Sequence, residues 1–102
     1  KQGKTWINEA WLDKHYIKPW SALAKEGIRV MVGEVGVFRR CPYPVALAYL
    51  TDVAALMQPH LWPVAFWHLD GNFGVLNTRR AGAKYEAFHG QKLDRRMVQI
   101  FQ

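Results

Sequence analysis

The sequence has few of the residues that several common chemistries require. It contains one cysteine, Cys41, which excludes an intrachain disulfide and a metal site built from several thiolates. Its one serine, Ser21, falls in a predicted helix, so a serine nucleophile is excluded as well. The histidines are widely separated and have no acidic or cysteine companion at ligand spacing, so we expect no metal site at His15, His60, His68 or His89.

Long apolar runs and nucleotide-binding motifs are missing too. No apolar run approaches the roughly 18 residues that span a bilayer, so we expect no membrane partner. There is no phosphate-binding loop, and the glycines of residues 71–74 do not make a dinucleotide fingerprint. The sequence therefore predicts no cofactor.

What the chain does have is apolar material and positive charge. Half of its 102 residues are hydrophobic and five are tryptophan, which is enough for the core of one small domain or of part of a larger one. The net charge of +6 comes largely from three arginine pairs that fall in different predicted elements. Because no DNA- or RNA-binding motif accompanies them, we interpret them as solvated faces and expect no nucleic-acid partner.

The central pattern is that of one βαβ unit. Residues 28–32 are rich in β-branched side chains and predict a strand buried on both faces, which Glu34 follows after a glycine. Residues 62–69 predict a second buried strand, and residues 45–57 predict the helix between them. Glu34 then lies at the carboxyl end of its strand, where barrels and open α/β sheets place their chemistry.

The flanking segments predict further helices. Asn8 can cap a helix that starts at Glu9, and Pro19 either kinks that helix or opens a second segment over residues 19–25 that stops at Gly27. We expect a short helical turn at residues 83–88 and a closing helix at residues 92–101. Two parallel strands form a poor sheet alone, so the chain is expected to be part of a larger α/β body or to assemble with copies of itself.

Two alternatives stay open for Glu34. It can pair with Arg39 or Arg40 as a structural carboxylate, or serve as a nucleophile or general base on a rigid strand end. Neighbouring strand residues point to opposite faces, so only one of Trp67 and His68 can face the site. A tryptophan there would offer a flat surface to a sugar ring.

Three stretches carry a family resemblance. Residues 9–20 followed by residues 27–36, which end Val-Met-Val-Gly-Glu-Val-Gly, resemble the sixth helix and seventh strand of glycoside hydrolase family 5, the cellulase and exo-β-glucanase type. Residues 67–77, Trp-His-Leu-Asp-Gly-Asn-Phe-Gly-Val-Leu-Asn, resemble the eighth strand and its loop. Residues 85–97 resemble the closing helix. The stretches occur in the family's order and spacing.

The resemblance implies a partial (β/α)₈ barrel of the α/β class, with a helix-strand-helix-strand-helix order in which the strands are barrel strands seven and eight. It implies that residues 1–102 form a single C-terminal fragment of the barrel domain. It also implies retaining hydrolysis with Glu34 as nucleophile, and substrate binding by Trp67, His68, Asn72 and Phe73. The family's acid/base glutamate has no counterpart here, and Val35 stands where the family has Phe or Trp.

The predicted function is that of a fragment of a retaining β-glycosidase or endoglucanase that hydrolyses O-glycosidic bonds of β-glucan or an oligosaccharide. Without the acid/base we expect the isolated chain to be weakly active or inactive. The alternative is a non-catalytic barrel fragment that associates with itself or with a complementary barrel fragment and keeps some carbohydrate contact.

Overall fold

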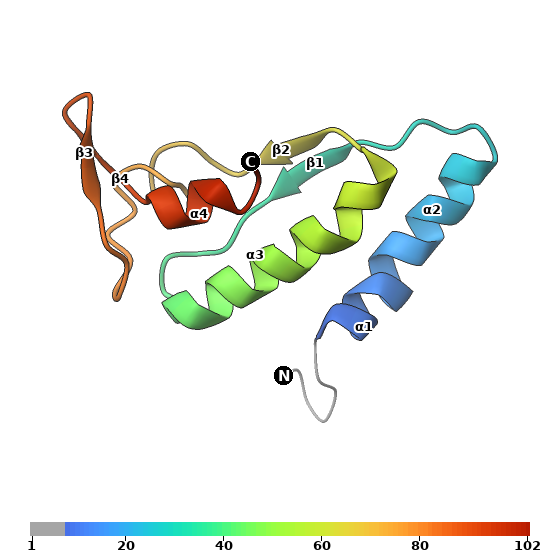
Figure 1. The fold of residues 1–102 in the computed structure, drawn as a ribbon, viewed down its shortest axis with the longest axis horizontal. Coiled ribbons are helices and arrows are strands. Elements are labelled where there is room, and N and C mark those ends of the chain that lie inside the picture. The colour runs from blue at the N-terminus through green and yellow to red at the C-terminus, as the bar shows by residue number, and fades with distance from the viewer. Residues whose placement is uncertain (1–7) are drawn as a thin grey trace.

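The computed structural model describes residues 8–102, in which a parallel strand pair and its helices are followed by a hairpin and a closing helix (Figure 1). The first helical run comprises α1 (Glu9–Leu12), a π-helical turn η1 (Asp13–Ile17) and α2 (Lys18–Lys25). The following elements are β1 (Val32–Val35), α3 (Tyr43–Met57), the 3₁₀ turn η2 (Gln58–His60) and β2 (Val64–Phe66). The chain ends with β3 (Glu86–Phe88), β4 (Gln91–Leu93) and α4 (Arg95–Gln99). None of these helices is long and apolar enough to cross a membrane.

The first helical run begins and ends where the sequence predicts. The Asn8 side chain caps it by accepting a hydrogen bond from the Trp11 amide at 2.9 Å. Pro19 lies in the first turn of α2, directly after the π-helical turn, so the missing proline N–H is accommodated without breaking the run. Gly27 ends the run with a φ of +88°, a conformation that glycine adopts without strain.

The parallel strand pair predicted from the sequence is present, but both strands are shorter than predicted. β1 and β2 pair at Val32 with Val64 and at Val35 with Phe66, with an irregularity between these two points. The predicted strand at residues 28–32 is wrong, because pairing begins only at Val32 and Met31 is 65% exposed. Likewise, the second strand covers only the centre of residues 62–69. A ladder extends only as far as both strands overlap, so the apolar residues beyond the overlap stay outside it.

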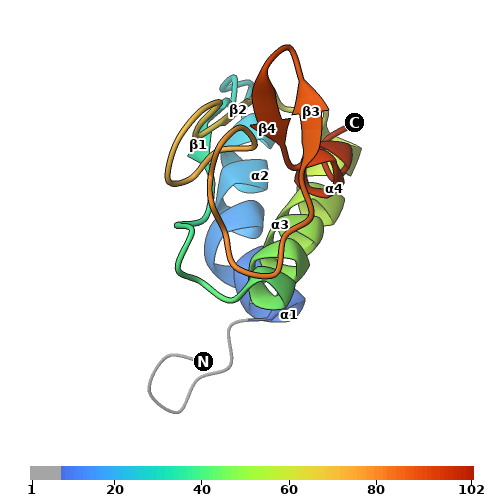
Figure 2. The same cartoon turned by 90° about the vertical axis from the view of Figure 1, so that its left-hand side faces the viewer.

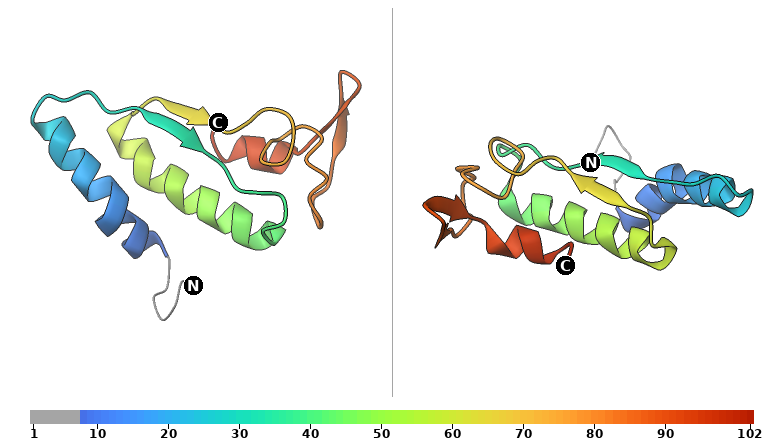
Figure 3. Two further views of the ribbon diagram at one scale, coloured as in Figure 1. Left: turned by 180° about the vertical axis from the view of Figure 1, so that it is seen from behind. Right: turned by 90° about the horizontal axis from the view of Figure 1, so that it is seen from above.

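The described chain is a thin, two-layered body whose helices lie on one side of the β1–β2 pair (Figures 2 and 3). Its shortest extent is 17 Å, along the viewing direction of Figure 1. The core lies between these layers, with Ala46 and Leu50 of α3 and Met97 of α4 fully buried. No described helix covers the opposite face of the strands, as expected for a segment of a larger α/β body.

The C-terminal part departs most from the prediction. Residues 83–88 form no helical turn; β3 instead pairs antiparallel with β4 in a hairpin. His89 and Gly90, at its tip, both have positive φ, as a two-residue type I′ turn requires. The closing helix predicted for residues 92–101 shrinks to α4, because the Asp94 carboxylate accepts a hydrogen bond from the Met97 amide at 3.2 Å and starts the helix there.

Candidate functional site

Glu34 lies within β1, one residue before its carboxyl end, and its side chain is exposed. The residues around it, Val32 and Val35, are buried in the core, so the irregular strand holds the carboxylate on a fixed backbone. Across residues 8–102, neither Arg39 nor Arg40 forms an ion pair with Glu34, and no hydrogen bond to its side chain is present. The alternative of a structural ion pair is therefore not realised here.

Trp67 directly follows β2 and lies beside the end of β1. Its amide donates a hydrogen bond to the Val35 carbonyl at 2.7 Å, and the peptide bond between Trp67 and His68 is cis. A Cβ built on Gly36 would overlap the Trp67 carbonyl oxygen, so only glycine permits this approach of the two backbones. The residues that flank Glu34 are thereby held against the backbone of Trp67, whose side chain is 48% exposed.

Four aromatic rings form a continuous group, which we call the strand-end cluster: Phe38, Trp67, His68 and Phe73. The ring centroids are 5.2 Å apart for Trp67 and His68, 5.9 Å for His68 and Phe73, and 5.3 Å for Phe73 and Phe38. Three of the four predicted sugar-binding residues are thus brought together. Phe38 was missed, although an aromatic residue four positions after Glu34 could have indicated it.

Asn72, the fourth predicted binding residue, is exposed and joins the two loops through its backbone. Its carbonyl accepts a hydrogen bond from the Arg39 amide at 2.7 Å. This bond ties the loop after β2 to the loop after β1, the loop that also carries Phe38. The two loops therefore form one connected surface at the carboxyl ends of the strands.

Two cavities adjoin predicted site residues without joining them. Glu34 borders a cavity of about 270 Å³ that is also lined by Tyr16 of η1 and Tyr49 of α3. His68 borders a separate apolar cavity of about 270 Å³ between β2 and α4. The His68 Nδ1 atom is buried and has no hydrogen-bond partner among the residues described. Trp67 lines neither cavity, so its contribution is an exposed surface.

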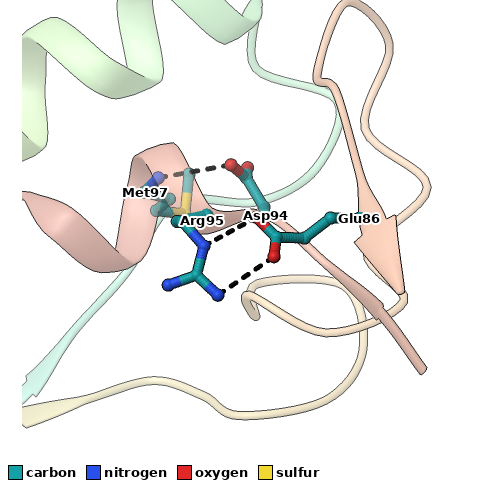
Figure 4. Close-up of polar contacts among 4 residues, drawn as sticks. All are labelled: Glu86, Asp94, Arg95 and Met97. Atoms are coloured by element: carbon teal, nitrogen blue, oxygen red, sulfur yellow. Dashed lines mark hydrogen bonds and ion pairs between the residues drawn. The ribbon is translucent and has the colours of Figure 1, made fainter. Parts of the chain in front are cut away.

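Two carboxylates of the C-terminal part of the chain, Glu86 and Asp94, are engaged in other contacts. Glu86 forms a two-pronged pair with Arg95, at 2.6 Å to Nε and 3.0 Å to Nη2, and these hydrogen bonds lower the pKa of Glu86 (Figure 4). Asp94 is fully buried and accepts a hydrogen bond from the Tyr43 hydroxyl at 2.7 Å. Burial, reinforced by this bond, raises the pKa of Tyr43. Over residues 8–102, no group of three or more potential metal ligands is present.

Solved structures similar to the chain include three glycoside hydrolase structures. One, described as a glycoside hydrolase, is 37% identical with a TM-score of 0.89 and matches 99% of this chain and 30% of its own length. The chain therefore resembles a portion of a glycoside hydrolase. This similarity confirms the resemblance to a glycoside hydrolase that the sequence motifs carry, and the α/β class with a parallel strand pair agrees with part of a barrel.

The other two structures are of Thermotoga maritima Cel5A, one in complex with mannotriose and one with cellobiose. They are 21% and 19% identical, with TM-scores of 0.65 and 0.64, and this likeness shows a shared fold. Each matches 99% of this chain and 34% of the Cel5A chain. The chain thus spans about a third of the length of its structural relatives. No protein-family model matches it, and no curated protein does.

Proposed function

We propose that residues 1–102 are the nucleophile-bearing C-terminal fragment of a retaining β-glycosidase or endoglucanase barrel that acts on β-glucan. In this proposal β1 and β2 are barrel strands seven and eight, Glu34 is the nucleophile and Trp67 is the sugar platform. The observation that carries it is the exposed Glu34 carboxylate, unpaired among the residues that the structure describes, on a strand whose end is hydrogen-bonded to Trp67.

The chemistry requires two carboxyl groups about 5–5.5 Å apart. The Glu34 carboxylate would attack the anomeric carbon and form a glycosyl ester, while the bond to the leaving oxygen breaks. A second carboxyl group would donate its proton to that oxygen and then deprotonate the water that hydrolyses the ester. We assign no carboxylate of this chain to the second role, so only the first half of the site is proposed here.

The strand-end cluster supports a carbohydrate substrate. Sugar rings have apolar faces of axial C–H groups that stack on aromatic rings, and Trp67 leaves about half of its surface open for such a contact. His68, Asn72 and Phe73 would complete the binding surface. The cellobiose and mannotriose in the two Cel5A structures are the ligand class that the proposal expects.

Covalent labelling tests the nucleophile without the missing acid. The reagent is a 2-deoxy-2-fluoro cellobioside with a dinitrophenolate leaving group, which departs with little proton transfer. Intact mass and peptide mapping should place one glycosyl adduct on Glu34, and Glu34→Gln should abolish it. Glu26→Gln, at an exposed carboxylate at the end of α2, is the matched control and should label as the unaltered chain does. An unlabelled chain, or an adduct on another residue, contradicts the proposal.

The uncovered face of the strands favours a second candidate function, a fragment that associates with itself or with the rest of a barrel. Leu69, just after β2, is 67% exposed, and Met31, just before β1, is 65% exposed. Sedimentation velocity over a hundredfold range of concentration should then show an increase in mass, and Met31→Asp should suppress it. A constant monomer mass at all concentrations contradicts self-association.

A further inference from the structure

Arg80 is a buried arginine with an unusual set of partners. It lies in the long loop between β2 and β3 and is only 3% exposed. Its Nη1 donates a hydrogen bond to the Phe38 carbonyl at 3.0 Å and its Nη2 donates to the Val37 carbonyl at 2.8 Å. Its backbone amide donates to the Tyr85 hydroxyl at 2.7 Å, whereas its Nε is buried and has no hydrogen-bond partner among residues 8–102. The two terminal nitrogens of the guanidinium group thus donate hydrogen bonds to two consecutive backbone carbonyls of the loop after β1.

This arrangement is costly for stability. Within residues 8–102, the ion pairs present involve Asp13 and Glu86, and Arg80 takes part in neither. Burying a cation without an anionic partner is expensive, and well-packed apolar residues commonly serve stability as well or better. Stability alone therefore gives a weak reason for an arginine here. The planar guanidinium group, which can donate to two carbonyls at once, gives a stronger reason for an arginine at this position.

We propose that Arg80 is a positioning residue that holds the loop after β1 against the loop after β2, and so fixes Glu34 relative to Trp67. This inference rests on the proposed function, because it assigns Arg80 to the same site. The carbonyls it holds are three and four residues after Glu34. The next residue along the chain, Arg39, donates its amide hydrogen bond to Asn72 in the other loop.

The contact continues through side chains. The Phe38 ring, on the residue whose carbonyl Arg80 binds, packs edge to face on Phe73 with centroids 5.3 Å apart. Arg80 therefore holds the backbone of a loop that contributes Phe38 to the strand-end cluster. A lysine is a point donor on a flexible stem and cannot bridge both carbonyls with a planar fork, so the role is specific to arginine.

Amide hydrogen exchange, read residue by residue by NMR on the 102-residue chain, tests the positioning. In Arg80→Gln the Arg39 amide should exchange about tenfold faster, the effect expected for losing hydrogen bonds that hold its loop. The Leu50 amide, at the centre of α3, should change by less than about twofold. Arg79→Gln, at the exposed neighbouring arginine, is the matched control and should leave both amides unchanged. An unchanged Arg39 amide, or equal acceleration at Leu50, overturns the proposal.

Chemical rescue separates positioning from packing. In Arg80→Ala, millimolar guanidinium should slow Arg39 exchange and restore the labelling rate of Glu34, whereas urea, of similar shape but uncharged, should do neither. Arg80→Lys should remain below the unaltered chain in labelling rate. Equal effects of guanidinium and urea, or full labelling in Arg80→Gln despite a released Arg39 amide, overturn the role. If the unaltered chain takes no label, the proposed function fails, while the exchange measurement still decides whether Arg80 holds the loop.

Discussion

The hydrogen bond between Tyr43 and Asp94 joins the start of α3 to the start of α4, and its removal should cost a defined amount of stability. Tyr43→Phe removes one hydroxyl and leaves the ring in the core. The lost bond runs to a carboxylate that is fully buried, so solvent does not replace the donor. Hydrogen bonds to charged groups contribute about 1.5–3 kcal/mol, and we expect the free energy of unfolding to fall by that amount at pH 7.

The pH dependence provides an independent check. Burial and the bond to Asp94 raise the pKa of Tyr43 in the folded chain above the value of about 10 expected when the chain is unfolded. Above pH 10 the unfolded chain therefore loses this proton first. The stabilising effect is complete below pH 10 and decreases as the pH rises, by at most about 1.4 kcal/mol per pH unit. Tyr43→Phe has no such proton, so its deficit relative to the unaltered chain should shrink above pH 10.

Urea unfolding followed by tryptophan fluorescence between pH 7 and pH 11 measures both effects. At pH 7 the matched control is Tyr49→Phe, because the Tyr49 hydroxyl has no hydrogen bond among the described residues and the residue is 36% exposed. At pH 7 it should lose less than about 0.5 kcal/mol. A Tyr43→Phe variant as stable as the unaltered chain at pH 7, or one whose deficit stays constant to pH 11, would refute the reasoning.

Two further predictions follow from single contacts. Gly36→Ala places a methyl group on the Trp67 carbonyl and should lower both the stability of the chain and the rate of Glu34 labelling. Gly33→Ala, whose new methyl group has nothing within 4 Å, should leave the labelling rate unchanged. Thermal unfolding and labelling kinetics check both variants. Arg95→Gln should raise the pKa of Glu86 back toward that of a free glutamate, because the hydrogen bonds that lower it are lost, and an NMR titration in which Glu86 titrates alike with and without the arginine would contradict this.

The helices could be predicted because their signals are local. Asn8, Pro19 and Gly27 each act on the backbone within one turn, so the bounds of the first helical run follow from the sequence. The helix predicted for residues 45–57 begins two residues earlier, at Tyr43, because Pro44 fits in a first turn where its missing donor is not needed.

The bounds of the strands and the presence of the hairpin could not be predicted, because they depend on which segments pair with each other. Residues 28–32 have the composition of a strand, but only a paired segment becomes one, and pairing starts at Val32. The hairpin was missed because His89 precedes its glycine, where asparagine or aspartate would have indicated a type I′ turn. Long-range pairing decided both outcomes.

The candidate site could be predicted only in part, because long-range contacts again decide which residues come together. Glu34 and Trp67 stand out from the sequence because each belongs to a recognisable stretch at a strand end. Arg80 does not, since nothing in the sequence distinguishes it from Arg79. Only the fold buries one arginine of the pair beneath the loop after β1 and leaves the other exposed.

The contacts within this chain indicate which of the two carboxyl groups of a retaining glycosidase it can supply. Retaining hydrolysis needs a nucleophile and a separate acid, and Glu86 and Asp94 are already committed to Arg95 and Tyr43. The Glu34 side chain has no hydrogen bond or ion pair within residues 8–102, and the backbone beside it is held by contacts internal to the chain, from the Trp67 amide to the Val35 carbonyl and across the two loops. The geometry of the proposed nucleophile therefore does not depend on the source of the acid. An activated leaving group, which needs no acid, should consequently label Glu34 even where a natural β-glucan is not cleaved.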